Sequence, residues 1–229
     1  MKLVMVHGAG ASSLSFYYQL RHFRNSKAID LPGHPTGTAC NSIDRYVEWV
    51  RGFNTARRYK DVVLCGHSMG GAIALQYALR YPDELKAVIL IGTGARLKVD
   101  TKYIRECEEA VADSSEWLES RREMYKGVED DINQVLMRRT MEIGPQVELN
   151  DLRACDQFDV MDKVHKVQLP THVMCGADDS STPVKFTEYL AQNIPGAQHE
   201  IIEGGSHHVQ LEKYQRVNDQ IERFMSSLR

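Results

Sequence analysis

The fold of this chain is decided around the stretch Cys65-Gly66-His67-Ser68-Met69-Gly70-Gly71. An apolar run, Val62-Val63-Leu64, precedes it, and the run Ala72-Ile73-Ala74-Leu75 follows it. This order predicts a strand, a sharp turn with a serine at its apex, and a helix. Because the backbone of such a turn is strained, the residues two before and two after the serine must be very small. Gly66 and Gly70 meet this requirement. The alternative is an ordinary glycine-rich turn between a strand and a helix.

Length and composition indicate one well-buried domain, or one domain with an insertion. The chain has 229 residues, of which 42% are hydrophobic and 26% charged, so extensive disorder is not expected. The net charge is −3 and the basic residues are scattered, which argues against a nucleic-acid partner. The apolar run at the start is too short for a signal peptide or a membrane span. The five cysteines form no Cys-x-x-Cys motif, and a cytoplasmic location is the simplest expectation.

Short apolar runs alternate with helical patterns, which predicts parallel strands joined by crossover helices. We therefore expect an α/β fold with a mainly parallel six-stranded sheet flanked by helices. The predicted strands are 3–6, 27–29, 62–65, 87–91, 171–175 and 199–202. The predicted helices between them are 16–23, 43–57, 68–80, 187–193 and 213–228.

The region 97–164 departs from this alternation of strands and helices. Its apolar residues recur at spacings of three and four, for example Ile104, Cys107, Ala110 and Val111, which predicts three or four helices without a strand. We interpret 97–164 as an inserted helical cap, and 1–96 with 165–229 as the core. The charged residues of this cap are expected to form the solvated faces of its helices.

A serine hydroxyl needs a base to take its proton and a third group to orient that base. Downstream of Ser68, an acidic pair, Asp178-Asp179, directly follows a predicted strand. A histidine pair, His207-His208, follows the last strand. The order of serine, acid and histidine is the one expected for a serine in this kind of turn. Position alone does not choose within either pair.

Two backbone N–H groups are candidates for binding an oxyanion. The segment His7-Gly8-Ala9-Gly10-Ala11 follows the first strand, and its small residues leave room for the N–H of Ala9 to face Ser68. The second candidate is the N–H of Met69, at the start of the helix that follows the serine, where the helix dipole favours negative charge.

Taken together, these segments resemble the α/β-hydrolase family over nearly the whole chain outside the cap. The resemblance rests on these segments: His7-Gly8, Asp30-Leu31-Pro32-Gly33-His34, Gly66-His67-Ser68-Met69-Gly70-Gly71, Phe158-Asp159 ahead of Pro170-Thr171, Gly176-Ala177-Asp178-Asp179 with Pro183, and His207 with Glu212. The family's acid pattern, Gly-x-x-Asp-x-x-x-Pro, selects Asp179. Its histidine usually has a glutamate five residues later, which selects His207. The family typically has two further strands before the first one here, so the resemblance implies a minimal sheet.

The resemblance implies a serine hydrolase with the catalytic residues Ser68, Asp179 and His207 and an oxyanion hole formed by Ala9 and Met69. We expect it to cleave carboxylic esters through an acyl-enzyme, with no cofactor and no metal, on a small-molecule substrate. The same triad serves thioesterases, lactonases and carbon–carbon bond hydrolases, and these stay open. Trp117, Tyr125, Met137 and Met141 could form an apolar substrate wall or simply the core of the cap.

Two other readings compete with an enzyme of this kind. The segment from Gly8 to Ser13 approaches a dinucleotide-binding Gly-x-Gly-x-x-Gly motif, but Ser13 replaces its third glycine. The same fold could also serve as a binding module with an idle site. The nine histidines show no metal-binding spacing. Among them, His7 and His34 are expected to stabilise turns, and His67 is expected to point away from the catalytic face.

Overall fold

Six strands form one sheet in which every neighbouring pair is parallel. The computed structural model describes residues 1–110 and 112–228. The strand order is β2-β1-β3-β4-β5-β6. The strands are β1 (Lys2–Val6), β2 (Ser26–Ile29), β3 (Val62–His67), β4 (Leu85–Ile91), β5 (Thr171–Gly176) and β6 (Gln198–Ile202). All six predicted strands are present, and the predicted fold class is confirmed.

The two faces of the sheet are covered by different helices. Successive side chains of β1 alternate, so that Leu3 and Met5 join one buried cluster and Val4 and Val6 the other. The helices α1 (Tyr17–His22) and α10 (Tyr214–Ser227) lie on the Leu3 side. The Val4 side is covered by α2 (Ile43–Ala56), α3 (Met69–Arg80) and α8 (Val184–Asn193). This two-sided burial explains why the strands read as continuous apolar runs.

Helix boundaries differ from the sequence prediction at a few places. Helix α8 begins at Val184, directly after Pro183, three residues earlier than predicted, because a proline is well placed just before a helix. A short helix, α9 (Val209–Glu212), precedes α10 and was not predicted. The short 3₁₀ helices are Ser13–Phe16, Pro82–Glu84 and Val164–Lys166.

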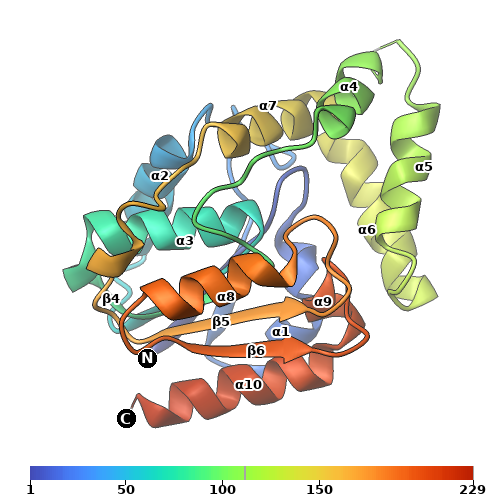
Figure 1. Ribbon diagram of the computed structural model, residues 1–229. Coiled ribbons are helices and arrows are strands. Elements are labelled where there is room, and N and C mark those ends of the chain that lie inside the picture. The colour runs from blue at the N-terminus through green and yellow to red at the C-terminus, as the bar shows by residue number, and fades with distance from the viewer. Residues whose placement is uncertain (111, 229) are drawn as a thin grey trace.

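Among the described residues, four α-helices lie between β4 and β5. We call them the α4–α7 layer: α4 (Thr101–Glu109), α5 (Ser115–Met124), α6 (Asp130–Ile143) and α7 (Pro145–Asp156). In Figure 1, α5 and α6 stand beyond the arrowheads of β5 and β6, so this layer lies over the carboxyl end of the sheet. Val111, part of the predicted helical pattern, lies outside the described residues.

The expectation that the charged residues of this layer are solvated is wrong for three of them. Arg121, Glu148 and Asp151 are all buried. Each is retained in the interior because it has polar partners there, described below.

Cys65 and Cys175 are buried and free, as expected for reduced core thiols. Within the described residues, we find no helix with the length and apolar character needed to cross a membrane.

Candidate active site

Ser68 stands at the turn between β3 and α3 with a φ of 53°, in the left-handed region. The turn is possible only because its flanking residues lack side chains. A Cβ on Gly66 would lie 2.0 Å from the carbonyl oxygen of Gly70, and a Cβ on Gly70 would lie 2.0 Å from that of Val6. These contacts give the physical reason for the Gly-x-Ser-x-Gly pattern.

The structure brings Ser68, His207 and Asp179 together in a hydrogen-bonded chain. The Nε2 atom of His207 lies 3.1 Å from the Oγ atom of Ser68. The Nδ1 atom of His207 lies 2.9 Å from Oδ2 of Asp179 and 3.1 Å from Oδ1. Since Nδ1 faces a carboxylate, it must carry the proton, which leaves Nε2 of the neutral ring free to accept from the serine. Asp178, by contrast, is exposed.

The side chain of Asp179 is fully buried and held as a carboxylate. It accepts hydrogen bonds from the backbone N–H groups of Ser181 and Thr182 and from the hydroxyl of Thr182. Burial alone would raise the pKa of Asp179, but His207 and the Thr182 donors hold it below the usual range. The carboxylate can therefore orient the imidazole of His207 and stabilise its protonated form.

Two further residues hold the loop that carries His207. Glu212 accepts the backbone N–H of Ser206 at 2.6 Å as well as its hydroxyl. His67 donates from Nε2 to the carbonyl oxygen of His207 at 2.8 Å and lines the same cavity as Ser68. The expectation that His67 points away from this site is therefore wrong. Burial, together with the nearby His207, lowers the pKa of His67 to about 3, so it adds no charge there.

The turn after β1 passes directly beside the serine. A Cβ on Gly8 would lie 3.1 Å from the Cβ of Ser68, and Ala9 lines the cavity with Ser68. Met69 is the first residue of α3, where backbone N–H groups have no partner within the helix. Both predicted oxyanion donors thus belong to backbone segments that adjoin Ser68.

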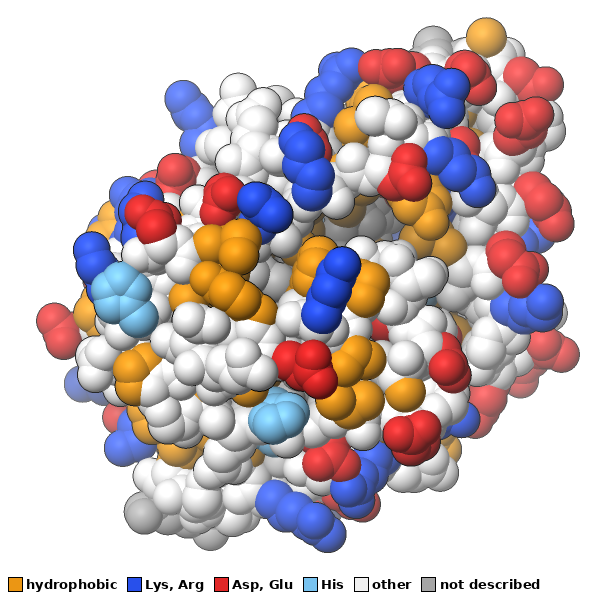
Figure 2. Space-filling view, viewed as in Figure 1, with side chains coloured by type: hydrophobic (Ala, Val, Ile, Leu, Met, Phe, Trp, Pro, Cys, Tyr) orange, Lys and Arg blue, Asp and Glu red, His pale blue; other side chains and the backbone are white. Residues whose placement is uncertain are grey.

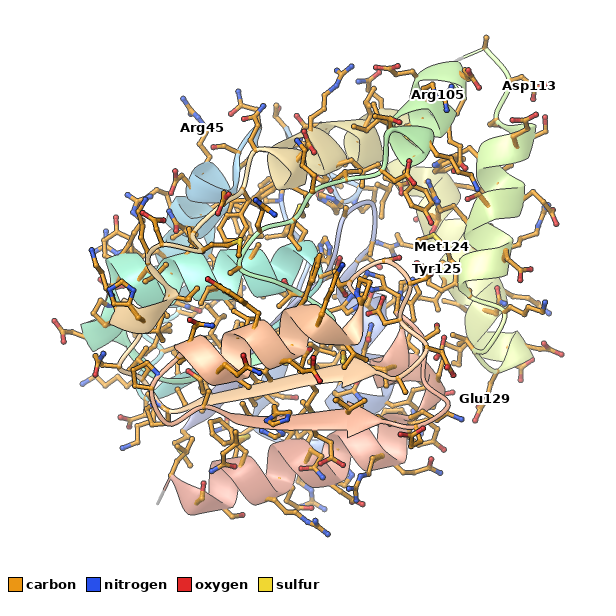
Figure 3. The ribbon with its side chains drawn as sticks, viewed as in Figure 1. Arg45, Arg105, Asp113, Met124, Tyr125 and Glu129 are labelled. Atoms are coloured by element: carbon orange, nitrogen blue, oxygen red, sulfur yellow. The ribbon has the colours of Figure 1, made fainter. Side chains whose placement is uncertain are left out.

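A cavity of about 390 Å³ opens above Ser68, and the α4–α7 layer forms its far wall. Its apolar lining residues are Ala9, Ala11, Leu97, Val99, Met124, Tyr125, Leu152, Cys155 and Phe186. Figure 3 shows Met124 and Tyr125 at the end of α5, on the side that faces the body of the protein. Of the four apolar candidates named from the sequence, Tyr125 lines this cavity. Trp117 packs within the layer, Met137 packs in a cluster that the layer shares with Leu211 of α9, and Met141 is exposed.

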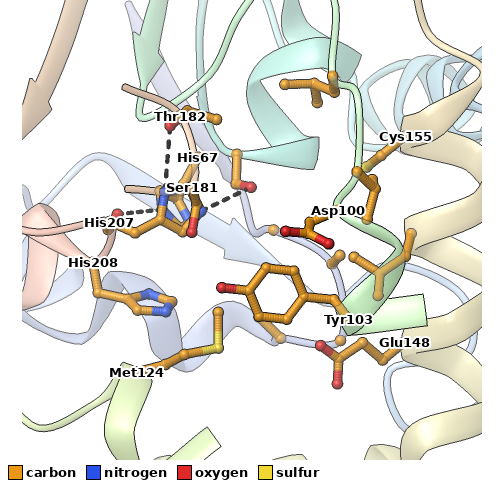
Figure 4. A pocket seen from close by; sticks show the side chains of 18 of the residues that line it. His67, Asp100, Tyr103, Met124, Glu148, Cys155, Ser181, Thr182, His207 and His208 are labelled. Carbon is orange, nitrogen blue, oxygen red and sulfur yellow. Dashed lines mark hydrogen bonds between the residues drawn. The ribbon is translucent and has the colours of Figure 1, made fainter. Parts of the chain in front are cut away.

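Polar residues of the layer also reach the cavity, and sequence reasoning missed them. Tyr103, Arg121 and Glu148 line it, and in Figure 4 the ring of Tyr103 lies between Glu148 and the histidines. One signal was available. Glu148 and Asp151 fall on the same helical stripe as the apolar Leu152 and Cys155, and acids on an apolar stripe indicate buried, paired charges.

The cavity widens outward into a shallower hollow, visible in Figure 2 between the α4–α7 layer and the body of the protein. Its acidic lining residues are Glu106, Glu116, Glu119 and Glu123. Lys102 is the one lysine or arginine among the described residues that line it. Within residues 1–110 and 112–228, no group of three or more His, Cys, Asp or Glu residues is arranged to hold a metal ion.

Comparison with known proteins identifies the class to which this fold and site belong. The chain is a member of the alpha/beta hydrolase family, which it matches over residues 3–220. It is 24% identical to an (E)-2-((N-methylformamido)methylene)succinate hydrolase of Acinetobacter baylyi, over 98% of this chain and 90% of that protein. It is also 24% identical to a pimeloyl-(acyl-carrier protein) methyl ester esterase of Neisseria meningitidis, over 90% of this chain and 85% of the relative.

Among solved structures, a thermophilic esterase superposes with a TM-score of 0.84 and 28% identity, covering 99% of this chain and 90% of the other. The predicted membership of the α/β-hydrolase family is thus confirmed. The family and these relatives support hydrolase activity, and membership of this family is consistent with a small-molecule substrate.

Proposed function

We propose that this protein hydrolyses carboxylic esters through an acyl-enzyme formed on Ser68. The observation that carries the proposal is the chain of hydrogen bonds from Ser68 through His207 to Asp179 at the floor of the cavity. The esterase relatives support it. Ser68, His207 and Asp179 are the proposed catalytic residues, and no cofactor is needed.

In the proposed reaction, Oγ of Ser68 attacks the ester carbonyl carbon while Nε2 of His207 takes the hydroxyl proton. The N–H groups of Ala9 and Met69 bind the oxyanion of the tetrahedral intermediate. When the intermediate collapses, the C–O bond breaks and the leaving alkoxide takes the proton from His207. A water molecule, deprotonated by His207, then attacks the acyl-enzyme, which releases the carboxylic acid and restores Ser68.

We further propose that residues 97–164 form a cap that selects the substrate. The cavity is at the small end of the range for ligand sites, so it favours a compact ester with an apolar portion. The glutamates of the outer hollow favour a neutral substrate over one with an anionic carrier, because a coenzyme A thioester would bring several negative charges past them. An uncharged ester is therefore favoured over the thioester alternative.

The test is a chain-length series of p-nitrophenyl esters, run beside lactones, a simple uncharged thioester and the matching acyl-coenzyme A. We expect turnover of short esters, and turnover of the uncharged thioester above that of the coenzyme A thioester. A fluorophosphonate probe should label the wild type and not Ser68→Ala. Asp178→Asn serves as a control, since Asp178 is exposed and adjoins the proposed acid. Equal labelling of wild type and Ser68→Ala, or no ester turnover at all, would refute the proposal.

A further inference from the structure

A buried carboxylate links the α4–α7 layer to the turn beside Ser68. Asp151 of α7 is fully buried and receives three hydrogen bonds. Its Oδ2 atom lies 2.8 Å from Nε2 of His34 and accepts the N–H of Gly10 at 3.0 Å. Its Oδ1 atom accepts the hydroxyl of Tyr46 at 2.6 Å. The three donors lie in separate segments, at sequence separations of 141, 117 and 105 residues from Asp151.

The surroundings of His34 require that its ring be protonated. Nδ1 faces the carbonyl oxygens of Leu31 and Pro32 at 3.2 and 3.1 Å, and Nε2 faces the Asp151 carboxylate. Both ring nitrogens therefore face acceptors, so both must donate. Burial opposes this charge, but the hydrogen bond and charge of Asp151 raise the pKa of His34 above its ordinary value.

The other groups near this pair leave its charges in place. His7, whose ring centroid is 4.7 Å from that of His34, is kept neutral because burial and the charge of His34 lower its pKa. The remaining titratable neighbours of Asp151 are Tyr46, Cys40, Cys155 and Glu148. Burial raises the pKa of Tyr46 and of the two thiols, so all three stay neutral, and Tyr46 donates its hydroxyl to Asp151.

Helix α7 also contacts Gly10 through a second residue, Glu148. Gly10 has a φ of +59°, and a Cβ there would lie 2.7 Å from the side chain of Glu148. Glu148 and Asp151 are three residues apart on α7 and therefore lie on one face of the helix. Gly10 thus lies under Glu148 and is hydrogen-bonded to Asp151. Its neighbour in the turn is Ala9, the proposed oxyanion donor.

We propose that Asp151, paired with His34, is a positioning residue that fixes the Ala9 N–H for the oxyanion through its hydrogen bond to Gly10. The inference rests on the proposed esterase function. It gives the α4–α7 layer a second role, because α7 then sets the geometry of a catalytic group as well as closing the cavity. A displacement of an oxyanion donor by about 1 Å is enough to slow such a reaction substantially.

The variant Asp151→Asn removes the carboxylate with little change in shape. If the amide oxygen replaces Oδ2, the His34 cation loses its counter-charge. If the amide nitrogen replaces Oδ2, it opposes the N–H of Gly10, so that donor meets donor. Either orientation disturbs the pair or the turn. Asp156→Asn is the matched control, because Asp156 is the last residue of the same helix and pairs with Lys98, away from Gly10, and its amide oxygen can still accept the N–H of Val99.

The readout separates positioning from a merely structural role. We compare kcat and KM with the affinities of two inhibitors that share one acyl group: a trifluoromethyl ketone, which forms a tetrahedral anion on Ser68, and an unreactive amide. In Asp151→Asn we expect kcat/KM and trifluoromethyl ketone affinity to fall together by about 10- to 100-fold. The affinity for the amide should change less than about twofold, and Asp156→Asn should behave as wild type.

Equal losses for both inhibitors, or no loss for either, would overturn the inference. If Asp151→Asn does not fold, Tyr46→Phe applies the same comparison, since it removes one donor to Asp151 and should lower kcat/KM and ketone affinity in parallel by a smaller factor. If the ratio of the trifluoromethyl ketone affinity to the amide affinity were the same in Tyr46→Phe as in the wild type, the inference would also be overturned. Failure of the proposed function is distinguishable, because the wild type itself would neither turn over esters nor react with the fluorophosphonate probe.

Discussion

Replacing Arg121 with methionine should destabilise the protein far more than an arginine substitution on the surface. The side chain of Arg121 is only 4% exposed, and its Nε lies 3.0 Å from Oε2 of Glu148, which is 8% exposed. Trp117 donates its indole N–H to the same Glu148 oxygen at 2.7 Å. Glu106 lies 3.6 Å away on the other side of the guanidinium. Arg121→Met therefore leaves a buried carboxylate with one neutral donor and a second carboxylate nearby.

Breaking a buried ion pair by removing one partner costs about 3–5 kcal/mol. With a urea m value of about 2 kcal/mol/M, the unfolding midpoint of Arg121→Met should fall by about 1.5–2.5 M. Arg122→Met is the matched control, because the side chain of Arg122 is 59% exposed and pairs with Glu119. Its effect should stay below about 1 kcal/mol.

The stability that is lost in Arg121→Met should also depend on pH. Burial raises the pKa of Glu148 even with Arg121 beside it, and removing the guanidinium raises that pKa further. A carboxyl whose pKa is higher in the folded state than in the unfolded state favours folding when protonated. The destabilisation of Arg121→Met should therefore be smallest at a pH below the pKa of Glu148 in the unfolded chain. It should grow as the pH rises through the higher pKa that Glu148 has in the folded variant.

Unfolding is followed at pH 5 and pH 8 by tryptophan fluorescence in a Trp49→Phe background, which leaves Trp117 as the sole tryptophan. The double variant Arg121→Met/Glu148→Gln should recover at least half of the lost stability, because the buried charge of Glu148 is removed with that of Arg121 and Glu106 keeps its pair with Lys102. A loss below about 1 kcal/mol for Arg121→Met at pH 8, or a double variant no more stable than the single one, would refute the reasoning.

Three further predictions concern other parts of the molecule. Asp179→Asn should lower kcat by about a thousandfold or more while Asp178→Asn does not, because the amide no longer fixes the imidazole tautomer; equal kcat values would contradict this. Gly70→Ala should lower the free energy of unfolding by about 3 kcal/mol or more, since its Cβ would lie 2.0 Å from a carbonyl oxygen of β1, whereas Gly52→Ala, in open space, should not. Burial lowers the pKa of His172 to about 4, so wild-type stability should fall as pH drops from about 6.5 to 4. His172→Leu should remove up to about 3 kcal/mol of that fall, and parallel urea midpoints for wild type and variant would refute it.

Local patterns were sufficient to predict the sheet and the turn that carries Ser68. Strands buried on both faces are recognisable as short apolar runs, and each lies between turn residues that end it. The Gly-x-Ser-x-Gly spacing reflects contacts within one strand–turn–helix unit, so the local sequence contains nearly all of the necessary information. The start of α8 was misplaced because the proline that precedes it is compatible with either a turn or a helix start.

The partners of Ser68 were harder to predict. Asp179 and His207 each stand next to a residue of the same type, and nothing local separates the members of either pair. The family resemblance chose one of each, and those are the two that lie in contact in the structure. His67 was misassigned because its role depends on the carbonyl oxygen of His207, 140 residues away.

The sequence by itself determined the parallel sheet, its flanking helices and the turn that holds Ser68, because these depend on periodicity and on contacts between near neighbours. Only the tertiary structure decided the roles of the charges in the α4–α7 layer. Arg121, Glu148 and Asp151 look like solvated helix residues until the helices pack. Arg121 and Glu148 then pair with each other across two helices, and Asp151 binds His34, Tyr46 and Gly10 from distant segments. Because these charges are buried, they must be paired. Helix packing also brings one of them, Asp151, to the turn beside Ser68.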